Sequence, residues 1–274
     1  MFKIIIMALL IFIGMVGYDN ITDKAQPTTP VQQEQQKVSK HEKSAAMALF
    51  VSLLPPKEEW PSPVHKFYLA FNMDEVIDPI RQNPNWTGLD AMSRDIPQAL
   101  IAIEDHAFYN HGAIAVEGIL RAALANINAG EVVQGGSTLT QQFVKNVFLS
   151  HEQSMERKIE EAVLSLMLED NYSKDEILEL YLNTTYFGAG STGIKQASRT
   201  YFGKAPSALT LAEAAVIASL PYAPTSLNPL ENPDGCKKRQ LLVLAAMHKY
   251  GMINQGQLAE AKAEKIRLTN GTVM

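Results

Sequence analysis

The chain has 274 residues, of which 46% are hydrophobic and 19% are charged. This balance supplies enough apolar material for a core and excludes wholesale disorder. The formal net charge of −5 excludes the basic excess of a duplex nucleic-acid binder, so we expect no nucleic acid as a partner. A single cysteine, Cys236, excludes an internal disulfide framework and a multi-cysteine zinc site.

The first segment has the pattern of a membrane-targeting sequence. Residues 4–18 carry no charge, and as a helix they would rise about 22 Å, short of the roughly 30 Å hydrocarbon layer. This length suits a signal peptide or a short signal anchor over residues 1–18. Both place the remaining chain on the extracytoplasmic side of the cell membrane. A buried core helix is disfavoured because the run is apolar on every face.

Residues 19–63 predict a polar tether that includes a short apolar helix. Residues 19–43 are polar and have little to bury. Residues 44–54 are mostly apolar and predict a helix that lies on the membrane surface or packs on the following domain. Packing on the domain is the commoner outcome for such runs.

Residues 64–268 predict a mainly α domain, and residues 269–274 form a tail. Asp95 is the predicted N-cap of one helix, with a proline in its first turn. Ser173 with Glu176, and Thr210 with Glu213, form capping boxes that predict two further helix starts. Strand-like alternation is scarce.

The first candidate functional group is the run from Glu104 to Gly112. Glu104 borders the apolar stripe of its helix and lies near the expected C-terminus, where the helix dipole disfavours a carboxylate. An acid in such a place is a candidate for function. The alternative is a surface acid with His106 and His111 in structural hydrogen bonds, and this run alone favours it. A metal site is disfavoured, since no helical HExxH spacing occurs.

The second candidate group is the segment from Gly135 to Asn146. Its glycines permit a tight turn, and Thr138 with Gln141 predicts a capping box. Backbone N–H groups, hydroxyls and Lys145 would suit a phosphate, although the nucleotide P-loop sequence is absent. Taken alone, the segment favours the simpler interpretation of a well-capped helix start.

The third candidate group is Arg157-Lys158-Ile159-Glu160-Glu161. Arg157 and Glu161 are four positions apart and can pair on one helix face. The predicted buried stripe of this helix is Ile159, Val163, Leu166 and Met167. The group is either a solvated ion-pair face or a pair of cations for an anionic leaving group beside a second carboxylate.

The two carboxylates together with these cations suggest sugar transfer from a pyrophosphate. Such a reaction needs a base for the attacking hydroxyl and positive charge for the departing phosphate. Without the cations, the pair Glu104 and Glu161 would equally suggest glycoside hydrolysis.

The order and spacing of these groups resemble the peptidoglycan glycosyltransferases (family 51) in their monofunctional form, over roughly residues 90–265. Five motifs occur in the order of the family. They are Glu104-Asp105 with Phe108 and His111; Gly136-Ser137-Thr138 with Gln141-Gln142 and Lys145-Asn146; Arg157-Lys158 with Glu161; Lys174, Ile177, Tyr181, Leu182 and Asn183; and Arg239, Val243, Leu244 and Met247.

The resemblance implies a lysozyme-like α fold, in which a cleft separates a larger lobe from a small mobile jaw. It implies polymerisation of lipid II into glycan strands, with inversion at the anomeric carbon and release of undecaprenyl pyrophosphate. It also implies a divalent cation, magnesium or manganese, bound with the pyrophosphate and without a dedicated protein cage. No organic cofactor is expected.

The resemblance also implies roles for individual residues. Glu104 would be the general base for the acceptor's 4-hydroxyl, and Glu161 would assist on the donor side. Lys145, Arg157 and Lys158 would hold the pyrophosphate. Further substrate-binding residues would be Ser137, Thr138, Gln141, Gln142, Asn146 and Asn183, with Tyr181 and Asn183 bracing the cleft.

Four positions depart from the family pattern. Gly112 follows His111 at once, and Ala115 occupies the place of an acid, so we expect the jaw segment to differ in shape. Gln153 replaces an arginine, and Glu160 stands where many members carry lysine. Both changes remove positive charge near the pyrophosphate, so we expect weaker donor binding and retained activity.

The expected partners are lipid II, the growing glycan chain and the membrane. No Ser-x-x-Lys occurs in the sequence, so we expect no transpeptidase domain in this chain and a separate transpeptidase as a candidate partner. Two alternatives remain: a lysozyme-like muramidase, which would share the fold and one acid, and a catalytically weak scaffold of the cell-wall synthesis complex.

Overall fold

The computed structural model describes residues 69, 72–129, 135–149 and 154–274, without the side chains of residues 123–126, 128, 129, 155 and 156. These residues belong to one compact unit, Lys66–Met274. The predicted targeting segment over residues 1–18 and the predicted tether with its short apolar helix over residues 19–63 lie outside the described residues. None of the helices in the described part has the length and apolar character needed to cross a membrane.

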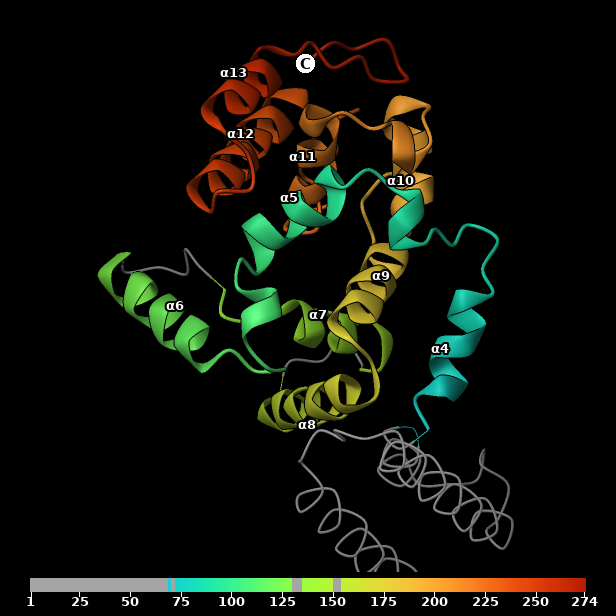
Figure 1. Ribbon diagram of the computed structural model, residues 1–274, viewed down its shortest axis with the longest axis vertical. Coiled ribbons are helices and arrows are strands. Elements are labelled where there is room, and N and C mark those ends of the chain that lie inside the picture. The colour runs from blue at the N-terminus through green and yellow to red at the C-terminus, as the bar shows by residue number, and fades with distance from the viewer. Residues whose placement is uncertain (1–68, 70–71, 130–134, 150–153) are drawn as a thin grey trace, which may run out of the picture. The chain divides into compact units, whose positions relative to one another are not determined.

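Helices make up nearly all the regular structure, which confirms the prediction of a mainly α domain (Figure 1). Within the described ranges, β-structure is limited to isolated bridges between Tyr186 and Thr192 and between Arg267 and Val273. The helices are α4 (Asp74–Arg81), α5 (Asp95–Glu104), α6 (Val116–Ala129), α7 (Leu139–Val147), α8 (Met155–Asn171), α9 (Lys174–Thr184), α10 (Ile194–Phe202), α11 (Leu211–Ser219), α12 (Pro233–Lys249) and α13 (Gln255–Ala263). Short 3-10 turns occur at Leu89–Ala91, Phe108–Asn110 and Pro206–Ala208.

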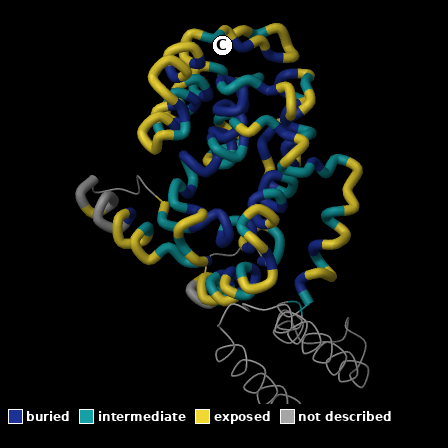
Figure 2. Tube along the Cα trace, in the orientation of Figure 1, coloured by how far each residue is buried: buried dark blue, intermediate teal, exposed yellow. Residues whose placement is uncertain are grey.

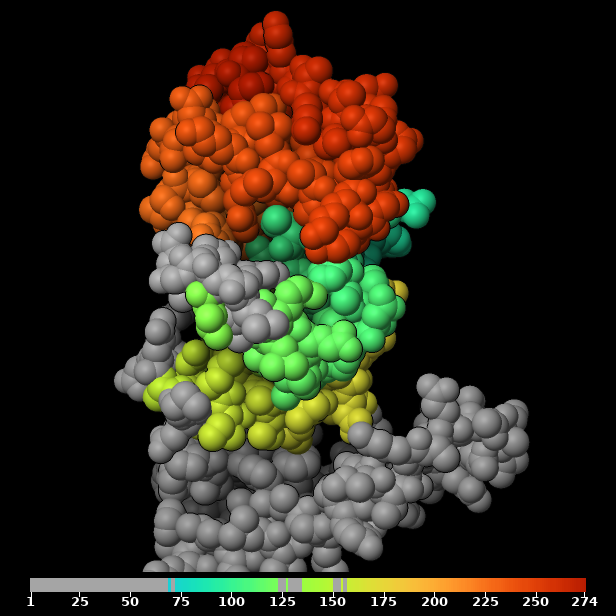
Figure 3. Space-filling view, turned by 90° about the vertical axis from the view of Figure 1, so that its left-hand side faces the viewer, coloured from blue at the N-terminus to red at the C-terminus, as the bar shows by residue number. Residues whose placement is uncertain are grey.

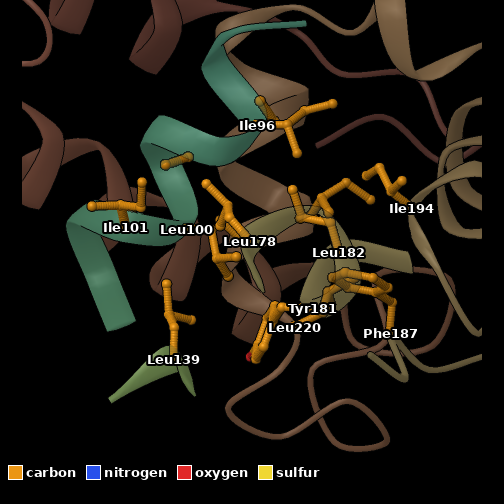
Figure 4. Packing of buried hydrophobic residues seen from close by; sticks show 14 of the residues in the cluster. Ile96, Leu100, Ile101, Leu139, Leu178, Tyr181, Leu182, Phe187, Ile194 and Leu220 are labelled. Carbon is orange, nitrogen blue, oxygen red and sulfur yellow. The ribbon is translucent and has the colours of Figure 1, made fainter. Parts of the chain in front are cut away.

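Two groups of packed helices carry the site. The helices α5, α11 and α12 pack against one another, and α13 covers α11 and α12. The helix α7 packs on both α8 and α9, and α10 contacts α9 and α11. One apolar cluster runs through both groups, with Leu100 of α5, Leu139 of α7 and Leu178 of α9 all fully buried (Figure 2 and Figure 4). This shared core holds the end of α5 and the start of α7 in a fixed relation.

The predicted capping boxes are confirmed. Side chain and backbone bond reciprocally between Thr138 and Gln141 at the start of α7, and the same pattern begins α9 and α11. The prediction for α5 was wrong by one position. Its N-cap is Arg94, which makes no side-chain cap, and Asp95 lies inside the first turn. A carboxylate in the first turn still interacts favourably with the helix dipole.

The predicted buried stripe of α8 was also wrong. Ile159, Val163 and Leu166 are 62%, 50% and 55% exposed, and only Met167 of the predicted set packs partly against the core. Among the α8 side chains that the structure describes, the buried ones are those of Glu161, Leu164, Ser165 and Leu168. Both sets have helical spacing, and the packing of α7 on α8 decides which one faces inward.

Candidate active site

Glu104 ends α5, so its carboxylate lies at the C-terminal end of that helix, as the sequence predicts. Leu100 and Ile101 lie one turn earlier and are buried, and they fix the face from which Glu104 projects. Glu104 is half-buried, and its Oε2 accepts a hydrogen bond of 3.0 Å from Nε2 of Gln142. The first candidate acid therefore contacts a residue of the second predicted group directly.

Gln142 is held in turn by Tyr181 of α9. The Tyr181 hydroxyl donates a hydrogen bond of 3.0 Å to Oε1 of Gln142, and Tyr181 is only 1% exposed. Burial first, and the nearby charge of Glu104 second, raise the pKa of Tyr181 above its usual value. The sequence motifs place Gln142 and Tyr181 in the site but contain no signal for this contact, because the pair is 39 positions apart.

Asp105 ties the end of α5 to the start of α7. Its Oδ2 accepts a hydrogen bond of 3.0 Å from the backbone N–H of Leu139, and its Oδ1 lies 2.6 Å from Nε2 of His111. The Thr138 hydroxyl donates to the carbonyl of Ala113 at 2.7 Å, which ties the segment after α5 to the start of α7. His111 thus has the structural role that the sequence left open, and these bonds fix the relation between Glu104 and Gln142.

The second carboxylate, Glu161, is buried between two cations of its own helix. Glu161 is 1% exposed; its Oε2 lies 3.4 Å from Nη1 of Arg157, and its Oε1 is in contact with Nζ of Lys158. The same Nζ donates a hydrogen bond of 3.1 Å to Oγ of Ser137. The structure therefore brings the second and third predicted groups together, with the lysine half-exposed beside the turn before α7.

Lys145 and Asn146 lie on the same face of α7 as Gln142, since they follow it by three and four residues. Both are exposed. In the described part of the chain no ion pair engages Lys145, so this cation faces solvent on the Glu104 side of α7.

Thr138 and Gln141 are 1% and 3% exposed and bond to each other in the capping box. Gly136 passes close to α6, where a Cβ would approach Cα of Ile119 to 3.0 Å. Thr138 and Gln141 were predicted to shape a donor site, and in the structure they form the helix start that directly follows Ser137. Their contribution is the shape of that helix start.

Asn183 packs against a segment that precedes α5. Its Oδ1 accepts from the backbone N–H of Thr87 at 2.9 Å, and its Nδ2 donates to the carbonyls of Thr87 and Glu179 at 2.9 and 2.8 Å. Glu179 bonds to the Trp86 indole and to the Leu89 backbone in the same way. Both polar atoms of the Asn183 side chain are thus used to fasten this segment to α9.

Glu169 of α8 is a residue that the sequence motifs do not single out. It accepts from the hydroxyl of Thr140 at 2.6 Å and pairs with Nζ of Lys174 at 2.7 Å, while that lysine lies 4.5 Å from the centre of the Phe108 ring. This network joins parts of the first, second and fourth motifs. Thr140 is 29 positions from Glu169, and Lys174 lies on the next helix, so the motifs gave no signal for this network.

Among the departures from the family pattern, Ala115 and Glu160 lie in the described part of the chain. Ala115 is half-buried just before α6 and its carbonyl accepts from the backbone N–H of Ile119. Glu160 is half-buried on α8 next to Glu161, and Gln153 lies outside the described residues. Their effect on donor binding stays a prediction.

Two apolar surfaces flank this region. On α6, Val116 and Leu120 are 63% and 60% exposed, with Ile119 on the same face. On α8, the exposed stripe is Ile159, Val163 and Leu166. Figure 3 shows the green surface that includes α6 directly above the yellow-green surface of α8. Exposed apolar areas of this kind mark sites that bind protein, membrane or an apolar ligand.

Comparison with known proteins decides the family. A model of the transglycosylase family matches residues 73–248. The chain belongs to the transglycosylase family. The family predicted from the five motifs is thereby confirmed, and with it the class of enzyme, a peptidoglycan glycosyltransferase.

Relatives of this transglycosylase include short and long proteins. A Cupriavidus necator protein provisionally named a transglycosylase is 41% identical over 194 residues, which cover 71% of this chain and 84% of that protein. Penicillin-binding protein 1A of Neisseria flavescens is 44% identical over 185 residues, 68% of this chain and 23% of its own length. Penicillin-binding protein 1F of Bacillus subtilis is 39% identical over 197 residues, 72% of this chain and 28% of its own length. The chain thus spans about a quarter of the length of these penicillin-binding relatives.

Proposed function

We propose that this transglycosylase polymerises lipid II into glycan strands, with inversion at the anomeric carbon and release of undecaprenyl pyrophosphate. One observation carries the proposal: Glu104 and the cations contact the same short segment, residues 137–142. Glu104 bonds to Gln142 at one end of the segment, and Lys158 bonds to Ser137 at the other. Glu161 holds Lys158 beside Arg157. Ser137 and Gln142 are five positions apart, so their backbones are separated by at most about 18 Å. A general base and a set of cations that contact one short segment could serve the two partners of a sugar pyrophosphate reaction, the attacking hydroxyl and the departing phosphate.

In the proposed reaction, Glu104 takes the proton from the 4-hydroxyl of the acceptor sugar. The oxygen attacks the anomeric carbon of the donor from the face opposite the pyrophosphate, so the new C–O bond forms with inversion. The bond from the anomeric carbon to the phosphate oxygen breaks, and its electron pair leaves with the pyrophosphate. General-base catalysis of this kind contributes about 10²–10⁴-fold.

The cations act on the leaving group. Lys158 and Arg157 are held by Glu161, which keeps their positive charges close together and reduces the cost of placing them side by side. The exposed Lys145 adds a further charge on the face of α7 that carries Gln142. Negative charge grows on the departing pyrophosphate as its bond breaks, so these cations stabilise the transition state more than the ground state.

A divalent cation remains part of the proposal. The described residues include no group of three His, Cys, Asp or Glu side chains that could hold a metal ion. A magnesium or manganese ion would therefore take its oxygen ligands mainly from the pyrophosphate, where it would supply additional positive charge. The steps above depend only on residues of this chain.

The exposed apolar stripes support a substrate with a lipid tail and a site at the membrane surface. The faces of α6 and α8 would lie against the bilayer, with the extracytoplasmic location following from the predicted targeting segment. A separate transpeptidase, predicted from the sequence, would cross-link the product; this partner is a proposal from the sequence alone.

The test is polymerisation of labelled lipid II by the full chain and by Glu104→Gln. We expect glycan product from the wild type and a loss of about 10²–10⁴-fold in Glu104→Gln. Glu260→Gln on the exposed face of α13 makes the same chemical change away from the site and should keep full activity. Equal product from the wild type and Glu104→Gln would remove the catalytic assignment. Release of soluble sugar from finished wall, without extension of lipid II, would support the muramidase, which has no use for the cation cluster.

A further inference from the structure

We propose that Tyr181 is a positioning residue for Glu104 and acts on it through Gln142. This inference rests on the proposed function, in which Glu104 is the general base. It assigns to Gln142 the orientation of the base, in place of contact with the donor substrate. Tyr181 does not touch the reacting atoms in this scheme.

The line of contacts crosses three helices. Glu104 ends α5, Gln142 lies in the first half of α7, and Tyr181 lies in the second half of α9. Both hydrogen bonds measure 3.0 Å, from Nε2 of Gln142 to Glu104 and from the hydroxyl of Tyr181 to Gln142. The Tyr181 ring lies among the buried apolar side chains of the core (Figure 4). The Tyr181 end of these contacts is therefore anchored in the packed core.

Donor and acceptor chemistry fixes the direction of the line. An ionised carboxylate can only accept, so Gln142 must turn its NH₂ group toward Glu104. Its carbonyl oxygen then faces Tyr181, which must donate. The phenol can do so throughout the working pH range, because burial and the charge of Glu104 raise the pKa of Tyr181. A half-turn of the Gln142 amide would place its carbonyl oxygen against the Glu104 carboxylate, and the bond to Glu104 would be lost.

The place of Glu104 in the fold explains why such a support is needed. A carboxylate on the last residue of a helix faces the negative end of the helix dipole and the free carbonyl groups of the last turn. A side chain there turns toward solvent unless a donor holds it. The Gln142 amide supplies that donor, and the buried phenol keeps the amide in place.

The test is a double-mutant cycle in the full chain, with Tyr181→Phe and Gln142→Met, read as kcat and KM for lipid II polymerisation. Tyr181→Phe removes one hydroxyl and keeps the ring. We expect kcat to fall about tenfold with KM unchanged within about twofold, because the base is displaced and the substrate contacts are not. In the Gln142→Met background, Tyr181→Phe should change kcat by less than about twofold, because the path to Glu104 is already broken.

Tyr201→Phe is the matched control. Tyr201 is also fully buried, and its hydroxyl donates to the carbonyl of Phe187 at 2.7 Å, outside the line to Glu104. The variant Tyr201→Phe loses one buried hydrogen bond, as Tyr181→Phe does, and should keep the wild-type kcat. An equal fall in kcat for Tyr181→Phe in both backgrounds, or an unchanged kcat in the wild-type background, would overturn the proposal.

A readout without turnover separates this inference from the proposed function. The infrared carboxylate band of Glu104 can be assigned from the difference between the wild type and Glu104→Gln. The line predicts that this band shifts in Tyr181→Phe and stays in place in Tyr201→Phe. A wild-type protein that makes no polymer would refute the proposed function, whereas an unshifted band in Tyr181→Phe would refute the positioning role.

Discussion

Lys158 of α8 and Ser137, which precedes α7, are joined by a hydrogen bond of 3.1 Å across 21 positions of the chain. The same ammonium group contacts the buried carboxylate of Glu161. This lysine therefore links the second and third motifs, and it holds a half-exposed positive charge at the turn where α7 begins.

Replacement of Lys158 should lower the rate of catalysis while the free energy of unfolding changes little. In Lys158→Met we expect kcat/KM for lipid II to fall about 100-fold, by analogy with the loss of one group that stabilises developing charge. Polymerisation of labelled lipid II measures the effect. Lys204→Met is a matched control, since Lys204 also pairs a half-exposed ammonium with a buried carboxylate, that of Glu213. Similar losses of activity in both variants would show that Lys158 acts only through the fold.

Asp105 should matter for stability as well as for activity. In Asp105→Asn, the side chain can no longer accept from both Leu139 and His111, because one of its two positions now donates. We expect the free energy of unfolding to fall by about 1–2 kcal/mol. Urea unfolding measures this change, and Asp234→Asn in the first turn of α12 is the control. An unchanged unfolding midpoint would mean that these bonds do not hold α5 to α7.

Positive charge introduced at Gln153 and Glu160, the two positions where the family carries basic residues, should tighten donor binding. In the double variant Gln153→Arg and Glu160→Lys we expect KM for lipid II to fall about tenfold, through added attraction for the pyrophosphate. Gln257→Arg with Glu260→Lys makes the same change in charge on α13 and should leave KM unaltered. No gain in polymerisation at low lipid II concentration would contradict the prediction.

The apolar stripe of α8 should lie in a bilayer. A fluorophore on Val163→Cys should be quenched by nitroxide-labelled lipid in vesicles, whereas one on Leu242→Cys should not. Both native side chains are about half exposed, so the two positions are matched, and the native Cys236 is buried and does not compete for the label. Equal quenching at both positions would exclude a preferred membrane face.

The sequence by itself determined the features that depend on neighbouring residues. The capping boxes at Thr138, Ser173 and Thr210 are confirmed, because a side chain three positions away completes each of them. The order and spacing of the five motifs identified the family, and the family match confirms it.

Only the tertiary structure decided which faces are buried and which distant groups meet. Ile159, Val163 and Leu166 have the helical spacing of a core stripe, yet the packing of α7 on α8 buries the face of Glu161 and leaves them exposed. Gln142 bonds to Glu104 and Tyr181, 38 and 39 positions away, and Asn183 bonds to Thr87, 96 positions away. Helical periodicity reports that an apolar face exists, whereas the choice of its partner depends on contacts between helices, which no local pattern contains.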